Sequence, residues 1–338
     1  MCGICGFAHP NPQQETTPEY LETMCRTIIH RGPDDQGIVS RRGAALGARR
    51  LSIIDLETGH QPISNEDKTI WIAYNGEVYN FPELKQELTG RGHRFKTRTD
   101  TETILHAFEE WGPDMVNKLQ GMFAAAVWDD RTKSLFLFRD RLGIKPLYYT
   151  QLADKSLIFG SEIKAILAYP GVPRQINPQA LDFFLSLEYI PAPYSIFEQI
   201  QKLPAGCFLE YSRGRIALQR YWNVPSQPPP EEVSSSLDSL QDEFFHLLQE
   251  SVRMRLLSDV PLGAFLSGGI DSSAIVGLMH TAGASPLKTF SIGFEEATYN
   301  ELDHARRIAQ KFSTDHKEFI IRPDALDLTE KLIRHLDE

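Results

Sequence analysis

The residues most able to do chemistry open the chain, in the sequence MCGICGF at positions 1–7. Met1 precedes a small side chain, the context in which an initiator methionine is usually removed. Removal would leave Cys2 with a free α-amino group beside its thiol. A thiol becomes a strong nucleophile only when it is deprotonated, and an α-amine that titrates near neutral pH can take that proton, directly or through water. Cys2 is therefore a candidate nucleophile for acyl transfer.

Other interpretations of Cys2 are open at this point. A cysteine near a terminus can simply be a small buried hydrophobic residue. Cys2 and Cys5 also form a C-x-x-C pair, which is typical of zinc sites and of dithiol redox sites. Zinc needs further ligands at close spacing, whereas Cys25 and Cys207 stand apart without a second C-x-x-C. A redox pair normally follows a strand in a βαβ unit rather than the first residue.

A second candidate site is the sequence SGGIDSS at 267–273, between a predicted strand at 263–266 and a predicted helix at 272–279. Two glycines let the backbone approach a polyphosphate with its N–H groups turned inward. The helix N-terminus adds a dipole that favours an anion, and three serines add hydroxyl donors. The loop is neither a Walker A motif nor G-x-G-x-x-G. A plain strand–helix turn with Asp or Ser as N-cap is the alternative; we favour the anion site.

The composition restricts the classes of function. With 338 residues and 41% hydrophobic content, the chain can form two domains, each with its own core. A net charge of −10 and a pI near 5.5 argue against a general nucleic-acid binder. Four cysteines without a small disulfide framework suit a reducing compartment. No apolar run approaches the length of a membrane-spanning helix and no secretory signal is present, so we predict a soluble cytoplasmic protein.

The elements that must position these residues differ between the two parts of the chain. In the first part, short aliphatic and aromatic runs predict strands and periodic segments predict helices. The predicted strands are 70–74, 124–128, 134–138 and 157–159, and the predicted helices are 82–88 and 101–111. Residues 223–236 are rich in Pro and Ser and predict a linker.

Strand and helix patterns alternate after this linker. A predicted helix at 237–257 precedes strands at 263–266, 288–294 and 318–321, which alternate with helices at 272–279 and 301–312. Such alternation predicts an α/β domain with a parallel sheet. The pattern stops at residue 338 without a closing signal, and only about 70 residues follow the loop at Ser267, whereas a domain of this kind usually needs about 100–200 residues. We therefore expect a truncated second domain.

The motifs together resemble a known family. The start M-C-G-I-x-G is similar to that of class II, N-terminal-nucleophile glutamine amidotransferases, and S-G-G-I-D-S-S is similar to the pyrophosphate loop of ATP pyrophosphatases. In this order they resemble glutamine-hydrolysing asparagine synthetases, over essentially the whole chain. Further matching motifs are His30–Asp34, Arg50–Asp55, Asn75–Asn80, Arg139–Tyr149 and Gly160–Glu162.

The resemblance implies a fold for each part. Residues 2–222 are expected to form an α+β, Ntn hydrolase-like αββα sandwich that acts as the amidotransferase domain. Residues 237–338 are expected to form part of an adenine-nucleotide α-hydrolase-like α/β domain, with residues 223–236 as the linker. The implied reaction is glutamine-dependent asparagine synthesis: ATP activates aspartate as aspartyl-AMP, and ammonia from glutamine displaces AMP.

The resemblance also implies roles for residues in the first part. Cys2 matches the nucleophile, and Asn75 and Gly76 match an oxyanion hole made of a side-chain amide and a backbone N–H. Arg50 matches the partner of the glutamine α-carboxylate. Residues matched to the glutamine site as a whole are Arg50, Leu51, Ser52, Ile53, Ile54, Asn75, Gly76, Glu77 and Asp100, with Glu77 and Asp100 around the α-amino group.

Structural alternatives exist for each of these residues. Asn75-Gly76 is also the strongest short signal for a type I′ hairpin turn. Arg50 could be a surface arginine, with Arg49 as its competitor. Asp100 could be a helix N-cap, a position that Thr99 or Thr101 could also take. We interpret residues 31–34 as a structured turn near the site and residues 139–149 as packing or interdomain contact.

In the second part, the resemblance implies an ATP site. The matching residues are Leu266, Ser267, Gly268, Gly269, Asp271, Ser272, Ser273 and Ile292, with Mg²⁺ bridging the phosphates and Asp271 as a metal ligand. The implied partners are small molecules (glutamine, aspartate and ATP), with no nucleic acid or membrane, and a homodimer is what the resemblance suggests. The alternatives are an amidotransferase for another carboxylate, a tRNA-modifying enzyme and a non-catalytic glutamine sensor.

Overall fold

The computed structural model describes residues 2–226, 236–294, 300–321 and 325–338, the side chains of 325–328 excepted. Contacts between residues divide the chain into two units. The N-terminal unit comprises Met1–Val224 with Asp337–Glu338, and the C-terminal unit comprises Pro225–Leu336. The predicted linker at 223–236 falls largely on residues outside the described ones.

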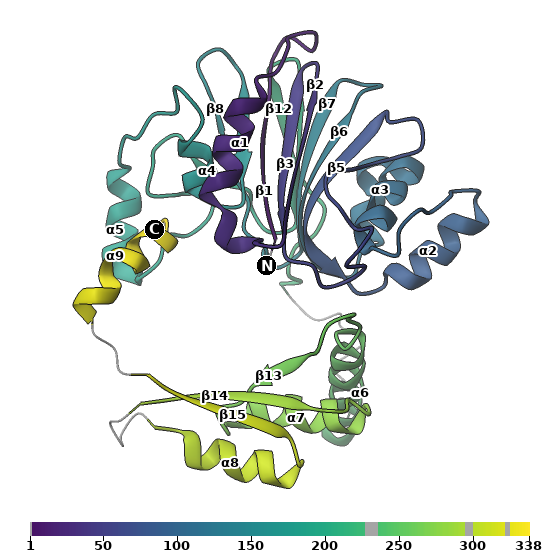
Figure 1. Ribbon diagram of the computed structural model, residues 1–338, viewed down its shortest axis with the longest axis vertical. Helices are drawn as coiled ribbons and strands as arrows, with labels where there is room; N and C mark the ends of the chain where they lie inside the picture. Colours follow the sequence, from purple (N-terminus) through teal and green to yellow (C-terminus); the bar gives the residue numbers. More distant parts are fainter. Residues whose placement is uncertain (1, 227–235, 295–299, 322–324) are drawn as a thin grey trace. The chain divides into compact units, whose positions relative to one another are not determined.

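Two six-stranded antiparallel sheets form the centre of the N-terminal unit (Figure 1). The first has the order β10-β8-β9-β1-β3-β2 and the second the order β12-β11-β7-β6-β5-β4. The strands of the first sheet are β1 (Gly3–Ala8), β2 (Asp35–Arg41), β3 (Ala44–Arg50), β8 (Tyr148–Gln151), β9 (Leu157–Gly160) and β10 (Gln201–Lys202). Those of the second are β4 (Ile63–Ser64), β5 (Ile70–Val78), β6 (Gly121–Asp129), β7 (Ser134–Arg139), β11 (Cys207–Ser212) and β12 (Arg215–Arg220).

Side chains that point alternately to the two faces of each strand form three hydrophobic layers in this unit. One face of β5 carries Ile72 and Tyr74 into a core shared with the helices that cover the second sheet. The other face carries Ala73 into a core between the two sheets, where Ile4 of β1 also lies. Side chains that alternate between two buried faces explain why these strands read as nearly continuous apolar runs.

Helices cover both outer faces of the paired sheets. Helices α1 (Pro18–Thr27) and α4 (Ile163–Leu167) share a core with β1, and α2 (Phe81–Gly90) and α3 (Asp100–Trp111) share one with β5 (Figure 1). The remaining described helices of this unit are α5 (Pro178–Leu187) and the 3₁₀ turns η1 (Ile29–Arg31) and η2 (Gly112–Asn117). This layering is the αββα sandwich that the family resemblance implies.

The predicted strands and helices of this unit are present, and each is longer than predicted. The hairpin-turn interpretation of Asn75-Gly76 is wrong. Both residues lie inside β5, where Asn75 pairs with Ala124 and Gly76 with Phe123 of β6. The pairing of β5 with β6 continues to Val78. The pairing of these two long strands therefore outweighs the local turn preference.

The C-terminal unit is an α/β structure with a three-stranded parallel sheet, as predicted. Its strands are β13 (Gly263–Phe265), β14 (Lys288–Phe294) and β15 (Asp315–Ile321), in that order and all parallel. Its described helices are α6 (Leu237–Met254), α7 (Ile270–Thr281), α8 (Leu302–Lys311) and α9 (Ala325–His335). A separate core forms from α6, α7, α8 and the sheet, including Val252, Val276 and Leu287.

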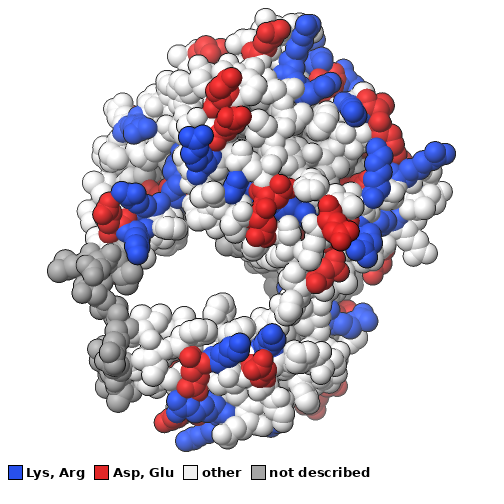
Figure 2. Space-filling view, in the orientation of Figure 1, with Lys and Arg blue, Asp and Glu red and all other residues white. Residues whose placement is uncertain are grey.

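The surface is mixed in charge. Basic and acidic side chains are interspersed over the face of the N-terminal unit seen in Figure 2. Among the described residues, no helix is both long enough and apolar enough to cross a membrane.

Candidate active site

Strand alternation brings Cys2 and Asn75 to the same cavity. Ile4 points from β1 into the core between the sheets, so Cys2, two residues earlier, leaves the strand on the same side. Ala73 points from β5 into that core, and Asn75 follows it by two residues. Both line a cavity of about 310 Å³. Residues 73 positions apart in sequence therefore meet because their strands face each other across the sandwich.

Nearly all residues of the predicted glutamine site line this cavity. The exception is Ser52, whose backbone N–H donates to Asp34 Oδ2 at 2.9 Å. The predicted residues that do line it are Cys2, Arg50, Leu51, Ile53, Ile54, Asn75, Gly76, Glu77 and Asp100. Lining residues that the sequence analysis missed are Gln61, Tyr74, Thr99, Thr101, Met122, Ile144 and Lys145.

Two of the missed residues had a signal in the sequence. Ile144 and Lys145 belong to the 139–149 segment, which the sequence analysis interpreted only as packing or interdomain contact. Asp140 shapes this segment, because its carboxylate accepts the backbone N–H groups of Ile144 at 2.9 Å and Lys145 at 3.0 Å. The turn so formed delivers both side chains to the cavity wall.

The thiol of Cys2 lies beside the backbone of Leu51. Leu51 N–H donates to Cys2 Sγ at 3.4 Å, and Leu51 O lies 3.6 Å from the same sulfur. Burial raises the pKa of the Cys2 thiol, and the Leu51 contact acts in the opposite direction. Arg31 Nε donates to Cys2 O at 3.0 Å, so the turn at 31–34 lies beside Cys2. The thiol therefore needs a base before it can act as a nucleophile.

Asn75 offers a hydrogen-bond donor for which the described residues provide no acceptor. Its Nδ2 is buried and has no partner among the described residues, and the whole residue is 1% exposed. A buried amide group without a partner is destabilising, so its presence at a cavity wall points to a ligand atom as acceptor. The adjacent Gly76 is required sterically, because a Cβ there would lie 2.4 Å from Met122 O.

Arg50 is held by a loop rather than exposed on the surface. Its Nη2 donates to Ile54 O at 2.8 Å and to Asp55 O at 2.7 Å, and the residue is 5% exposed. Gly59 allows this arrangement, since a Cβ there would lie 2.2 Å from the same nitrogen. Arg49 is also buried, but it donates to Gln36 Oε1 and does not line the cavity. Arg50 is therefore the arginine available to a bound anion.

Asp55 fixes the loop that holds Arg50. Its carboxylate accepts the backbone N–H groups of Thr58 at 3.0 Å and Arg98 at 2.8 Å. Burial acts to raise the pKa of Asp55, but these hydrogen bonds outweigh burial and lower the pKa to about 2. The loop thus keeps its negative charge and its shape through the neutral pH range.

Two carboxyl groups share the cavity with this guanidinium. Burial raises the pKa of Glu77 to about 8, and the neighbouring Asp100 adds to the rise. Burial also raises the pKa of Asp100, although its Oδ2 accepts hydrogen bonds from Tyr74 Oη at 2.8 Å and Val78 N at 3.0 Å. Burial lowers the pKa of Lys145, and Glu77 opposes that change. A cavity with a guanidinium and two carboxyl groups suits a zwitterion such as an α-amino acid.

Asp100 is not the N-cap of α3. Thr99 takes that position and accepts the backbone N–H of Glu102 at 3.2 Å, and Asp100 is the first helical residue. Asp100 is thereby free to point its carboxylate toward β5, where Tyr74 and Val78 bind it.

The predicted nucleotide site is divided between a cavity and the loop beside it. A cavity of about 300 Å³ in the C-terminal unit is lined by four of the predicted residues, Leu266, Ser267, Ser272 and Ile292. Its other lining residues are Phe265, Phe290, Ser291, Glu301 and Leu302. The predicted residues Gly268, Gly269, Asp271 and Ser273 lie in the loop and the first turn of α7 without lining this cavity.

The loop has features that suit an anion. Gly268 has a φ of +83°, and a Cβ there would lie 2.4 Å from the carbonyl carbon of His304. The Oγ of Ser273 is buried without a partner among the described residues. Gly269 is the N-cap of α7, which begins at Ile270, two residues before the predicted start. Close backbone packing, an unpaired hydroxyl and a helix N-terminus therefore meet at this loop.

Asp271 is the second residue of α7. It is exposed, and it belongs to no cluster of three or more His, Cys, Asp or Glu side chains in the part of the chain that the structure describes. A Mg²⁺ ion there would need phosphate oxygens and waters for its other ligands, which is how Mg²⁺ commonly binds with nucleotides.

Two family models match this chain, one in each part. Residues 1–222 match the family model of the glutamine amidotransferase domain, and residues 243–338 match that of asparagine synthase. Asparagine synthetase [glutamine-hydrolyzing] 1 of Bacillus subtilis is 37% identical over 342 residues, which cover 100% of this chain and 53% of that protein. Putative asparagine synthetase [glutamine-hydrolyzing] 2 of Methanocaldococcus jannaschii is 38% identical, covering 95% of this chain and 65% of its own.

A solved structure described as the allosteric regulatory enzyme of purine biosynthesis shares the fold. Its TM-score is 0.50 at 14% sequence identity, and the match covers 95% of this chain and 90% of that one. The chain spans about half the length of the first two Bacillus subtilis relatives that it matches.

Proposed function

Because the chain belongs to the glutamine amidotransferase family, we propose that its N-terminal unit hydrolyses glutamine to glutamate and ammonia. The proposed amidotransferase domain is residues 2–222, followed by a linker at 223–236. Residues 237–338 are proposed to belong to an ATP-dependent domain that uses the ammonia. The active centre of the first reaction is the cavity around Cys2.

The proposed first step is attack by Cys2 on the side-chain amide of glutamine. With Met1 removed, the α-amine of Cys2 accepts the thiol proton, which overcomes the raised thiol pKa. A bond forms between Sγ and the amide carbon, and the carbonyl electron pair moves to oxygen. The Nδ2 of Asn75 and the backbone N–H of Gly76 are proposed to donate to this oxyanion.

Collapse of the tetrahedral species breaks the carbon–nitrogen bond. The proton held on the α-amine passes to the leaving nitrogen, so ammonia departs and a glutamyl thioester is left on Cys2. Water, deprotonated by the same amine, then adds to the thioester carbon. The carbon–sulfur bond then breaks, glutamate leaves, and the proton held on the amine passes to the thiolate, which restores the thiol.

Glutamine recognition is proposed to use the charged walls of the cavity. Arg50 binds the α-carboxylate, and its guanidinium is held in place by Ile54 O and Asp55 O. Glu77 and Asp100 bind the α-amino group. A cationic amine beside both carboxyl groups would favour their ionised forms, opposing the burial that raises their pKa values.

The second unit is proposed to make asparagine. Leu266 and Ile292 would contact adenosine, and Ser267, Ser272 and Ser273 would contact phosphate oxygens, with the unpaired Ser273 hydroxyl as the main support. When bound, ATP would supply an adenylyl group that activates the side-chain carboxylate of aspartate, and ammonia would displace AMP. Asp271 is the proposed contact for Mg²⁺.

The observation that carries the glutaminase proposal is the unpaired Asn75 amide at a cavity that Cys2 also lines. The test is glutamate release from glutamine by the purified chain, with the N-terminal mass recorded. We expect release from the chain that lacks Met1 and none from Cys2→Ala. The control Cys207→Ala removes a buried thiol from β11, which does not line the cavity, and should keep the activity.

Asn75→Ala is the second arm of this test. It should lower kcat by about 10²–10³-fold with little change in KM, as loss of one oxyanion donor does. Asn80→Ala is the matched control, since the Asn80 side chain is bonded to Lys118 O and Gln120 N outside the cavity. A folded, trimmed chain that releases no glutamate, or equal kcat losses in Asn75→Ala and Asn80→Ala, would contradict the proposal.

A further inference from the structure

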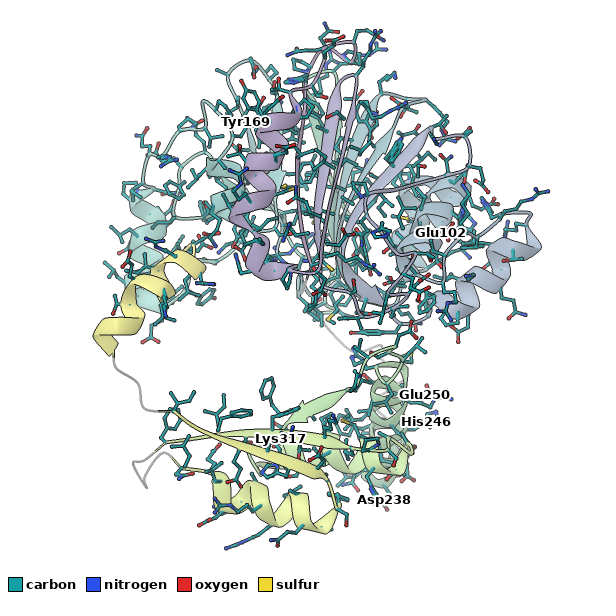
Figure 3. The ribbon with its side chains drawn as sticks, in the orientation of Figure 1. Glu102, Tyr169, Asp238, His246, Glu250 and Lys317 are labelled. Atoms are coloured by element: carbon teal, nitrogen blue, oxygen red, sulfur yellow. The ribbon has the colours of Figure 1, made fainter. Side chains whose placement is uncertain are left out.

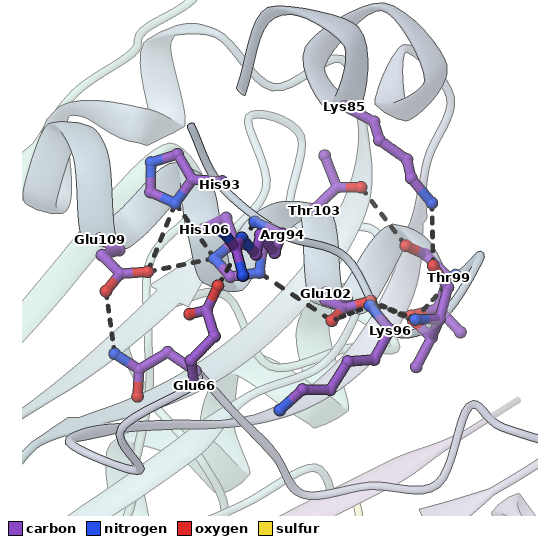
Figure 4. Close-up of polar contacts among 12 residues, drawn as sticks. Glu66, Lys85, His93, Arg94, Lys96, Thr99, Glu102, Thr103, His106 and Glu109 are labelled. Carbon is purple, nitrogen blue, oxygen red and sulfur yellow. Dashed lines mark hydrogen bonds and ion pairs between the residues drawn. The ribbon is translucent and has the colours of Figure 1, made fainter. Parts of the chain in front are cut away.

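Three side chains with metal-binding atoms converge at α3, outside the cavity (Figure 4). His93 lies in the segment between α2 and α3, and His106 and Glu109 lie one turn apart on α3. The Nδ1 atoms of the two histidines are 3.3 Å apart. Glu109 Oε2 lies 3.1 Å from His106 Nδ1 and 3.5 Å from His93 Nδ1.

These spacings match those between neighbouring ligands of one small cation. Bonds of roughly 2.0–2.1 Å in a tetrahedral zinc site separate neighbouring ligand atoms by about 3.3 Å. The three distances, from 3.1 to 3.5 Å, bracket that value. Two imidazole nitrogens facing each other beside a carboxylate oxygen form a triangle of possible electron-pair donors.

Neighbouring groups orient the three ligands. His93 Nε2 lies 3.1 Å from Glu110 Oε2, and a proton on Nε2 leaves the lone pair on Nδ1, which faces His106. Asn65 Nδ2 donates to Glu109 Oε1 at 3.0 Å, so Oε2 is the oxygen turned to the histidines. Carboxylate partners on the far nitrogen of a ligand histidine are the usual support of metal-binding histidines.

The burial of these three side chains also favours a metal-binding site over a chance cluster on the surface. The side chains of His106, His93 and Glu109 are 1%, 12% and 24% exposed. On the far side of His106, Glu102 Oε1 lies 3.9 Å from Nε2, and the Glu102 carboxylate binds the backbone N–H groups of Lys96 and Thr97. Helix α3 and the segment that precedes it are therefore already joined around this cluster.

We propose that His93, His106 and Glu109 bind one Zn²⁺ ion, with water as the fourth ligand. Two imidazoles and a carboxylate select zinc over Mg²⁺ or Ca²⁺, which prefer oxygen ligands. The ion would fasten the segment between α2 and α3 to the helix that begins at Asp100. His106 lies six residues along α3 from Asp100, about 9 Å along the axis. The ion is thus a structural clamp for the helix that carries a wall of the cavity.

The test is zinc binding by the full chain. The Cys2→Ala chain is used as the parent, because the Cys2 thiol could bind zinc independently. After removal of metal with a chelator, zinc is titrated against a chromophoric competitor, and Co²⁺ is added to a second sample for its visible spectrum. We expect one zinc per chain, a rise in melting temperature with zinc and the intense visible bands of four-coordinate Co²⁺.

Variants in the same parent locate the ion. His93→Gln and Glu109→Gln should each weaken zinc binding by at least about tenfold, and Glu110→Gln should weaken it by about 10–100-fold through loss of orientation. His246→Gln is the control, since His246 is exposed on α6 and pairs only with Glu250 among the described contacts (Figure 3). A folded parent that binds no zinc, or equal affinity in the parent and His93→Gln, would overturn the proposal.

Discussion

At the scale of single residues, the cavity around Cys2 contains groups whose ionisation differs from that in water. Glu77 shows this most clearly, since burial and the nearby Asp100 raise its pKa to about 8, against the opposing effect of Lys145. In the ligand-free protein the carboxyl group is therefore mostly protonated at neutral pH. An ionised Glu77 needs a positive partner, which the amino group of a bound amino acid can provide.

This raised pKa predicts the pH dependence of stability in the ligand-free protein. Between the ordinary Glu pKa of 4.5 and the folded value of about 8, the folded state binds more protons at Glu77 than the unfolded state. Stability from this group is therefore complete below pH 4.5 and is lost as the pH rises toward 8. Glu77→Gln should flatten this part of the melting temperature profile, measured by calorimetry from pH 5 to about 8.5.

The control for this prediction is Glu83→Gln on α2, which removes an exposed carboxylate. Its profile should follow that of the unsubstituted chain. Saturating glutamine should also reduce the pH dependence, because a bound ammonium group favours ionised Glu77. A Glu77→Gln profile that declines as steeply as the parent would show that another group causes the slope.

At the scale of elements, the loop between β13 and α7 depends on close backbone contact. Gly268 has a positive φ and lies against the backbone of α8 at His304 and Ala305. Gly283, at the end of α7, has nearly the same φ of +82° but no neighbouring atom within 4 Å of a Cβ. Substituting each glycine with alanine therefore separates the cost of the left-handed conformation, which both positions share, from the cost of the steric contact, which only Gly268 has.

Gly268→Ala should therefore disturb the C-terminal unit more than Gly283→Ala. The conformational cost, about 1–2 kcal/mol, is common to both substitutions, and only Gly268→Ala adds a clash with α8. Hydrogen exchange of β13 and α7 measures the effect locally, because all four tryptophans, at positions 71, 111, 128 and 222, lie in the other unit. Equal acceleration of exchange in the two variants would show that the loop can move away from α8.

At the scale of the whole molecule, each unit has its own hydrophobic core. The three large clusters of the N-terminal unit draw on residues 4–221, and the cluster of the C-terminal unit draws on residues 248–312. The cavity around Cys2 is lined only by residues from 2 to 145. Folding and glutamine hydrolysis are therefore expected to be properties of the N-terminal unit.

A chain that ends at Val224 tests this expectation. It loses the contacts of Asp337 and Glu338 with the N-terminal unit, among them the ion pair between Lys164 and Asp337 at 3.0 Å. We expect its melting temperature to fall by no more than about 4 °C, the shift that about 1 kcal/mol causes in a domain of this size. Glutamate release should persist and should disappear with Cys2→Ala. Aggregation of the shortened chain would mean that the first unit depends on the second.

Much of the fold could be predicted from the sequence because its elements are strongly patterned. Strand β14 coincides with the predicted range of 288–294, and the helix predicted at 101–111 differs from α3 by one residue. The hairpin-turn alternative for Asn75-Gly76 failed because a local turn preference is weaker than the pairing of β5 with β6. Ser52 was matched to the glutamine site, but it does not line the cavity, and its backbone N–H donates to Asp34 Oδ2.

The sequence alone determined the candidate nucleophile, the loop at 267–273 and the order of elements, because each depends on neighbouring residues. Only the tertiary structure decided which distant residues share a site. Packing of the two sheets face to face brings Cys2 and Asn75 to one cavity, and the turn held by Asp140 adds Lys145 to its wall. Packing of a loop on α3 brings His93 to His106 and Glu109. Burial, which no local pattern specifies, sets the pKa values of Glu77 and Asp100.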